Sequence, residues 1–279
     1  MPAPPIPRTL SLAFFGNLDI SVLDELPHGR LPIVTKLART DSARTKVYQF
    51  IDQEITKGHQ AFVIFPLVEE SLLMKDIKAA VKEHEELTQK IFPHRKVGLI
   101  HGKLKAEEKE RIMHDFKAKK YDILVATAVI EVGIDIPNAT VILIEEAGRF
   151  GLAQLHQFRG RVGRSSTQSY CFLFPGSSQG SLDRLKVLER ETSGFAIAEA
   201  DLGLRGPGAF FGTRQSGLPD IAMENLTNMK LISLARDAAE NILREDSDLS
   251  RHPLLREALT RFEKVGAYER PTRYKFYFG

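Results

Sequence analysis

Three arginines set among glycines form the most chemically distinctive stretch of the sequence. Arg159, Arg161 and Arg164 lie within the run Gln-Phe-Arg-Gly-Arg-Val-Gly-Arg that ends at position 164. Glycine leaves the backbone uncluttered, and a planar guanidinium can grip two oxygens of a phosphate or carboxylate at once. The spacing therefore predicts an anion-handling segment. The alternative is that these arginines form structural salt bridges at the edge of a sheet.

Small polar residues follow two apolar runs and could hold a second anion. Thr127 closes the run at 121–126, and His101-Gly102-Lys103 follows the run at 97–100. Hydroxyl, imidazole and amine groups in such loops can contact the phosphates of a nucleic acid. The alternative is a satisfied threonine in a turn and a structural histidine. The basic run at 117–120 is typical of a solvated helix end.

Apolar runs and amphipathic helical patterns alternate along the chain and must position these groups. The strand-like runs are 33–37, 61–65, 97–100, 121–126, 141–145 and 170–174. Helical patterns cover 41–58 (with Asp41 or Ser42 as cap), 69–90 and 104–116. This alternation predicts an α/β fold, a parallel sheet covered by helices on both faces. Functional groups in such sheets lie beyond the carboxyl ends of the strands, so we expect 101–102, Thr127, 145–151 and the arginine segment at that edge.

Composition divides the chain into three parts. Residues 1–29 precede the predicted sheet and are proline-crowded over 1–10, 30–177 carry the sheet, and 178–279 are predominantly helical. In the last part, glycines surround Arg205, Arg214 and Gln215 and predict a tight loop over 201–217. Two amphipathic helices are predicted beyond it, at 226–243 and 254–262.

Bulk properties narrow the function classes. The 279 residues are 43% hydrophobic and 27% charged, as expected of a globular protein, and the net charge of +3 leaves any nucleic-acid contact to local clustering. Cys171 is the single cysteine, which excludes an intramolecular disulfide and a cysteine-based metal cluster. The scattered histidines predict no metal site. Neither a secretory pattern nor a membrane span is present, so we expect a cytoplasmic location.

The motifs, taken in order, resemble those of the superfamily 2 helicases and, within them, the RecG branched-DNA translocases. Residues 125–135 are similar to helicase motif V, 98–102 to the segment before it, and 199–217 to a translocation motif. The amino-acid sequence at 205–208 and 212–217 favours RecG over the transcription-repair coupling factor. The match to motif VI comprises Gln157, Gly160, Arg161, Gly163 and Arg164.

The resemblance implies a RecA-like fold and a role for each matched residue. It implies that Arg161 and Arg164 are catalytic arginine fingers for ATP hydrolysis. The other implied residues bind nucleotide (Gly133, Asp135, Gln157), contact DNA (His101, Gly102, Lys103, Thr127) or couple hydrolysis to translocation (Glu199, Arg205, Arg214, Gln215). The implied partner is branched or duplex DNA, and the implied location is the bacterial cytoplasm, at the nucleoid.

Two motifs of a complete helicase are absent. The sequence has no Gly-x-x-x-x-Gly-Lys-Ser/Thr loop to cradle a triphosphate and no Asp-Glu-x-His to hold magnesium. Residues 2–8 resemble motif III with prolines in place of both hydroxyls. We therefore expect a second RecA-like lobe plus translocation motif, inactive alone, with ATP and magnesium held mainly by a first lobe. That lobe and a DNA-splitting wedge domain are the expected partners within the same protein.

Three alternatives remain open from the sequence. The chain could come from a transcription-repair coupling translocase. It could be a DNA-binding module without ATPase activity, which would show steeply salt-dependent binding. It could also be an interaction domain that supplies arginines to another ATPase, which would show activation on mixing.

Overall fold

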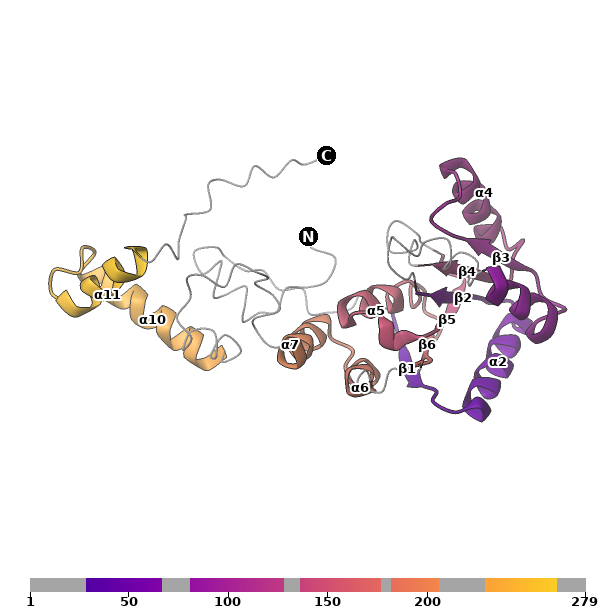
Figure 1. The fold of residues 1–279 in the computed structure, drawn as a ribbon, viewed down its shortest axis with the longest axis horizontal. Coiled ribbons are helices and arrows are strands. Elements are labelled where there is room, and N and C mark those ends of the chain that lie inside the picture. Colours follow the sequence, from indigo (N-terminus) through magenta and orange to yellow (C-terminus); the bar gives the residue numbers. More distant parts are fainter. Residues whose placement is uncertain (1–28, 67–80, 128–135, 177–181, 206–228, 265–279) are drawn as a thin grey trace. The chain divides into compact units, whose positions relative to one another are not determined.

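A computed structural model describes residues 29–66, 81–127, 136–176, 182–205 and 229–264 (Figure 1). Within these residues, one compact unit extends to Ala198 and a second begins at Glu199. No helix among the described residues is long and apolar enough to cross a membrane.

The first unit contains a six-stranded sheet in which every pairing is parallel, in the order β1-β6-β5-β2-β4-β3. The predicted parallel sheet is therefore confirmed. The strands are β1 (Val34–Leu37), β2 (Gln60–Phe65), β3 (Val97–Ile100), β4 (Ile123–Thr127), β5 (Ala139–Ile144) and β6 (Tyr170–Leu173).

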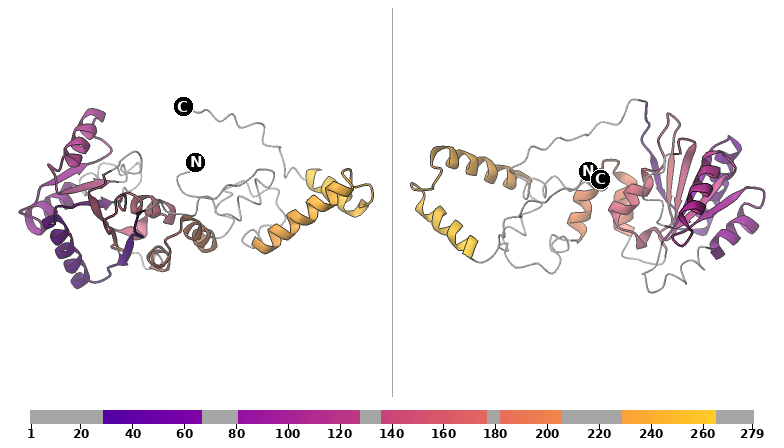
Figure 2. Two further views of the ribbon diagram at one scale, coloured as in Figure 1. Left: turned by 180° about the vertical axis from the view of Figure 1, so that it is seen from behind. Right: turned by 90° about the horizontal axis from the view of Figure 1, so that it is seen from above.

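Helices cover both faces of the sheet, as predicted (Figures 1 and 2). Residues 81–86 are helical and continue into a short π-helix, and a 3₁₀ turn follows β5. The helical elements of the first unit are α2 (Asp41–Thr56), the π-helix (Leu87–Ile91), α4 (Ala106–Lys117), the 3₁₀ turn (Ala147–Arg149), α5 (Leu152–Arg159), α6 (Leu182–Arg190) and α7 (Gly194–Arg205), which continues into the second unit.

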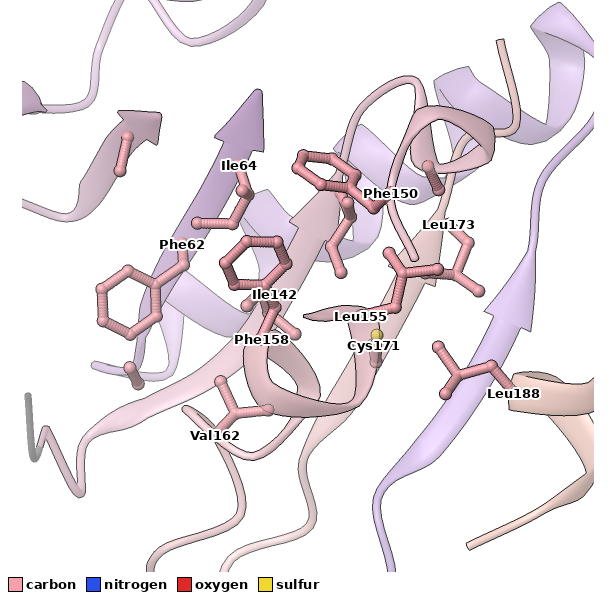
Figure 3. Close-up of a cluster of buried hydrophobic side chains, with 14 of the residues drawn as sticks. Phe62, Ile64, Ile142, Phe150, Leu155, Phe158, Val162, Cys171, Leu173 and Leu188 are labelled. Atoms are coloured by element: carbon pink, nitrogen blue, oxygen red, sulfur yellow. The ribbon is translucent and has the colours of Figure 1, made fainter. Parts of the chain in front are cut away.

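Two apolar layers, one on each face, stabilise the sheet. Side chains of α2 and of the π-helix pack on one face, whereas α4, α5 and α6 pack on the other. In the second layer Phe158 of α5 lies against Phe150 with ring centroids 5.2 Å apart, and Leu155 lies beside Cys171 of β6 (Figure 3). Full burial raises the pKa of the Cys171 thiol to about 12, so this cysteine is an inert core residue.

Two local predictions were wrong, and the sequence analysis predicted no helix over 152–159. The cap of α2 is Thr40, whose extended backbone lets its hydroxyl accept from the Ala43 amide at 3.2 Å. Residues 152–159 form α5, because Leu152, Leu155 and Phe158 share a buried face. Residues 201–205, expected in a loop, lie in α7, because the alanine-rich stretch of this helix favours helix and outweighs Gly203, and the rest of the expected loop lies outside the described residues.

The described part of the second unit consists of the C-terminal part of α7 and two helices near the predicted positions, α10 (Met229–Glu245) and α11 (Pro253–Lys264). Asp246 organises the turn between α10 and α11. Its carboxylate accepts from the Ser250 amide at 2.9 Å, the Arg251 amide at 2.8 Å and the His252 ring at 2.9 Å. These bonds hold the pKa of Asp246 below its usual range, which stabilises the turn.

Candidate functional site: two opposite edges of the sheet

His101 and Thr127 lie at the same edge of the sheet, as predicted. β3 and β4 are parallel neighbours with Ile100 opposite Ala126, so both chains leave the sheet at their carboxyl ends side by side. Thr127 is the last residue of β4 and His101 is the first after β3. The register therefore brings together two groups that are 26 positions apart in the sequence.

Buried polar atoms at this carboxyl edge have no hydrogen-bond partner within the described residues. Thr127 is 0% exposed, and its Oγ1 makes no hydrogen bond there. The same holds for Nδ1 of the half-buried His101. Burial, followed by the charge of Lys109, lowers the pKa of His101, so this imidazole is neutral at pH 7. An unsatisfied buried hydroxyl costs about 1–3 kcal/mol, and a ligand that reaches it would recover part of that cost.

The turn between β3 and α4 presents Gly102 and Lys103, both of which are exposed. The amide of Leu104 donates to the His101 carbonyl at 3.2 Å and closes the turn. Nζ of Lys109, from the second turn of α4, donates to the Gly102 carbonyl at 2.8 Å. This places backbone and basic groups beside Thr127, as a phosphate contact requires.

The arginine segment lies at the opposite edge, so the prediction that it shares the carboxyl edge was wrong. α5 carries the chain back along the sheet, and residues 160–169 lead into the amino end of β6. Gln168 Nε2 donates to the Pro32 carbonyl at 2.8 Å, and the Val34 amide donates to Ser169 at 3.0 Å. The segment therefore lies beside the start of β1, at the amino edge.

Gly163 packs the arginine segment against this edge. Its φ of +73° is a conformation that other residues rarely adopt, and a Cβ at this position would lie 2.8 Å from Cγ1 of Ile33. Arg161 and Arg164, on either side, are both half-buried, and Nε of Arg164 donates to the Gly160 carbonyl at 3.2 Å. The glycine thus fixes the backbone that carries the two candidate arginine fingers.

Arg159 does not join the other two arginines. It is 4% exposed and donates to the carbonyls of Leu188 at 3.0 Å, Glu191 at 2.8 Å and Thr192 at 3.1 Å. These carbonyls end α6, so Arg159 caps that helix and ties α5 to the segment before α7. Arg159 is therefore structural, although through hydrogen bonds to backbone carbonyls and not through the salt bridges considered as the alternative.

His156 also contacts the guanidinium of Arg159. Nη2 of Arg159 lies 3.0 Å from Nδ1 of His156. Because a guanidinium only donates, Nδ1 must accept, and the ring proton is on Nε2. Burial, followed by the charge of Arg159, lowers the pKa of His156 to about 4.

Only some of the remaining candidate residues lie within the described structure. Gln157 is half-buried on α5, four positions before Arg161. Glu199 is exposed on α7, and Arg205 is the last residue of that helix. The other four lie outside the described residues: Gly133, Asp135, Arg214 and Gln215.

The donors at the amino edge suit an anion. Arg161, Arg164 and the carboxamide of Gln157 can together donate to the oxygens of a nucleotide phosphate. No group of three or more histidine, cysteine or acidic side chains within the described ranges could hold a metal ion. The donors at the amino edge therefore suit phosphate oxygens.

One ion pair was missed by the sequence analysis. Nη2 of Arg44 in α2 donates to Glu145 at 2.9 Å and to the hydroxyl of Tyr48 at 3.3 Å, and its guanidinium lies 4.2 Å from the ring centroid of Phe174. Glu145 directly follows β5 and is 5% exposed, and burial raises the pKa of its carboxyl. The two charges are 101 positions apart, so no local pattern indicates the pair.

Comparison with known proteins first defines the class. Residues 43–166 match the family model of the helicase conserved C-terminal domain. Residues 191–264 match the model for the C-terminal part of domain 3 of the ATP-dependent DNA helicase RecG. The parallel sheet is thus a helicase C-terminal lobe, and the helices that follow it are of the RecG type.

Individual relatives agree with this class. The ATP-dependent DNA helicase RecG of Synechocystis is 53% identical over 268 residues, which are 95% of this chain and 32% of that protein. The RecG of Thermotoga maritima is 48% identical over 244 residues, 87% of this chain and 31% of that protein. The chain belongs to the RecG helicase family, as predicted, and corresponds to its C-terminal portion.

A solved structure agrees as well. The structure of RecG bound to a three-way DNA junction is 46% identical, with a TM-score of 0.62 over 82% of this chain and 29% of that chain. The predicted RecA-like fold is therefore confirmed. The chain spans about a third of the length of its curated relatives.

Proposed function

We propose that the chain is the C-terminal lobe and translocation segment of an ATP-dependent DNA translocase that remodels stalled replication forks and other branched DNA. The observation that carries this proposal is the position of two anion-handling groups at opposite edges of one continuous sheet. Arg161 and Arg164 lie at the amino edge, and Thr127 and His101 lie at the carboxyl edge. The RecG relatives, named as ATP-dependent DNA helicases, support the same function.

At the amino edge, the chain's own residues would stabilise a phosphoryl-transfer transition state. When bound, ATP would supply the transferable phosphoryl group and magnesium would neutralise part of its charge, both held mainly by a first RecA-like lobe. Arg161 and Arg164 would donate to the oxygens on which negative charge accumulates, an effect worth about 10³ to 10⁵ in rate. Gln157, Gly133 and Asp135 would bind the nucleotide beside them.

At the carboxyl edge, the same lobe would hold DNA through its phosphates. The hydroxyl of Thr127, the neutral ring of His101 and the turn at Gly102 and Lys103 can all donate to phosphate oxygens. Such contacts carry no base preference, which suits a protein that moves along DNA of any sequence. The proposed ligand is branched or duplex DNA.

Movement of the lobe would then pass to the helical region. We assign residues 30–177 to the helicase lobe, 178–279 to the translocation region and 1–29 to the connection between lobes. Glu199, Arg205, Arg214 and Gln215 would couple hydrolysis to stepping. The hydrogen bonds from Arg159 to the end of α6 support this coupling, because they join α5 to the segment that leads into α7. The proposed place of action is the nucleoid of a bacterial cytoplasm.

A chimera tests this function. The chain alone should hydrolyse essentially no ATP. The chain fused to the remaining N-terminal two-thirds of the Synechocystis relative should release phosphate in response to forked DNA. ATP turnover by the isolated chain at the rate of a complete helicase would contradict the proposal. So would a folded, DNA-binding chimera without ATPase activity, which would favour a simple DNA-binding module.

A further inference from the structure

We propose that Lys109 is a positioning residue for the DNA-binding edge, a role that rests on the proposed function. Its ammonium would hold the Gly102 carbonyl and thereby set the conformation of the turn that presents His101 and Lys103 beside Thr127. Lys109 itself would not contact DNA.

The side chain of Lys109 folds back onto the turn between β3 and α4. It is half-buried in the second turn of α4, and its own amide donates to the Lys105 carbonyl at 3.0 Å. Its Nζ reaches back to the Gly102 carbonyl at 2.8 Å, across seven positions of sequence. One of its three N–H groups is thus engaged by a peptide carbonyl, whereas Lys103 is exposed at the surface.

Gly102 itself has no side chain to pack. The Leu104 amide donates to the His101 carbonyl at 3.2 Å, and the Leu104 side chain packs against the core. Without the ammonium, the Gly102 peptide can rotate, because glycine tolerates most backbone angles. Rotation would move the atoms on either side of it, which are the proposed phosphate contacts.

The charge of Lys109 has a second effect on the same turn. It is the largest contribution, after burial, to the lowered pKa of His101. The ammonium thus favours the neutral ring, whose unprotonated nitrogen accepts while the other donates. Geometry and protonation of His101 therefore both depend on Lys109.

A lysine that only positions the turn and a lysine that contacts a phosphate predict different salt dependences of DNA binding. A lysine that neutralises a phosphate releases a counterion, so its loss reduces the magnitude of the slope of log K against log salt by about 0.9 on duplex DNA. Loss of a positioning Lys109 would also displace Lys103, which is itself a proposed phosphate contact, so the two roles are compared in a Lys103→Met background. In that background, loss of a positioning Lys109 lowers affinity without changing the slope, whereas loss of a phosphate-contacting Lys109 reduces the magnitude of the slope by about 0.9 more.

The experiment measures binding of the whole chain to a fluorescent 20-base-pair duplex, by anisotropy over a range of salt concentrations. Lys103→Met should reduce the magnitude of the slope by about 0.9. When Lys109→Met is added to Lys103→Met, binding should weaken about tenfold more with no further change in the slope, whereas adding Lys109→Arg, which can still donate to the carbonyl, should leave the affinity unchanged. Lys117→Met removes the same charge from the exposed far end of α4 and should bind like the parent chain.

Three outcomes would overturn the inference: a further fall of about 0.9 in the magnitude of the slope when Lys109→Met is added to Lys103→Met, unchanged affinity on that addition, or an equal loss of affinity in Lys117→Met. Thr127→Val distinguishes this from failure of the proposed function. If Thr127→Val binds about tenfold more weakly while Lys109→Met binds normally, only the role of Lys109 fails. If Thr127→Val binds normally, or the parent chain does not bind, the proposed DNA edge itself fails.

Discussion

The two edges of the sheet are built in opposite ways. At the carboxyl edge, Thr127 and His101 retain buried polar atoms without hydrogen bonds among the described residues, and Gly102 and Lys103 are exposed. At the amino edge, residues 160–169 pack against the start of β1. The difference suits two tasks. A surface proposed to hold and release DNA would expose its donors, whereas arginines proposed to meet a transition state would need a fixed backbone.

The largest effect, on the ATPase rate, should come from the two half-buried arginines Arg161 and Arg164. In the chimera with the N-terminal part of the Synechocystis relative, Arg161→Ala or Arg164→Ala should reduce the DNA-stimulated ATPase rate about 10³-fold or more. Affinity for forked DNA should change by less than about threefold, because the proposed DNA edge lies at the other end of the strands. Phosphate release and anisotropy measure the two quantities. Lost binding with normal turnover would mean that the tasks of the two edges are exchanged.

The buried Arg159 should matter for stability rather than for chemistry. Arg159→Met leaves three carbonyls at the end of α6 without their donor, and we expect about 3 kcal/mol less free energy of unfolding. Arg190→Met removes an exposed arginine from the same helix and should change stability by less than about 0.5 kcal/mol. Urea unfolding followed by circular dichroism compares them. Equal stabilities would show that the cap of α6 contributes nothing.

Two costs of substituting Gly163, the steric clash and the backbone strain, can be measured separately. Gly163→Ala adds a methyl group 2.8 Å from Ile33 at a φ of +73°, whereas Gly58→Ala has a φ of +90° and nothing within 4 Å. Strain alone should cost Gly58→Ala about 1 kcal/mol, and the clash should raise the cost of Gly163→Ala to about 3 kcal/mol. Shortening Ile33 to alanine in the same chain should recover part of the difference. Equal losses at both glycines would mean that the amino edge is loosely packed.

The neutral His156 predicts a pH dependence. Its pKa is about 4 in the folded chain and about 6.5 in the unfolded chain, so the unfolded state binds more protons between these values. The free energy of unfolding should therefore be intact above pH 6.5 and should fall as the pH decreases to 4. His156→Gln can still accept from Arg159 but cannot titrate, so its stability should depend less on pH in this window. Identical pH profiles for the two proteins would refute a neutral, buried His156.

The smallest effect on stability is expected at the carboxyl edge. Thr127→Val replaces a buried hydroxyl that has no partner among the described residues with a methyl group of similar size. We expect the free energy of unfolding to stay within about 1 kcal/mol or to rise slightly, because no hydrogen bond is lost. Thermal unfolding measures this change. A loss above 2 kcal/mol would reveal a structural role for the hydroxyl and remove the contrast between the edges.

Local sequence patterns determined the elements of the sheet. Runs of apolar residues located all six strands to within two residues at each end, because strands buried on both faces require continuous apolar side chains. The order of motifs also indicated the RecG family, which the comparisons confirmed. Each strand and each motif is recognised from residues that are close in sequence.

Tertiary structure decided where the functional groups meet. The eight residues of α5 return the arginine segment to the amino edge, a direction that no local pattern specifies. The same packing buried Arg159 and paired Arg44 with Glu145, 101 positions away. Sequence determines which groups are available for chemistry because side-chain chemistry is local. Their distances depend on how α5 and the strands pack, since contacts between distant residues form only when the whole core assembles.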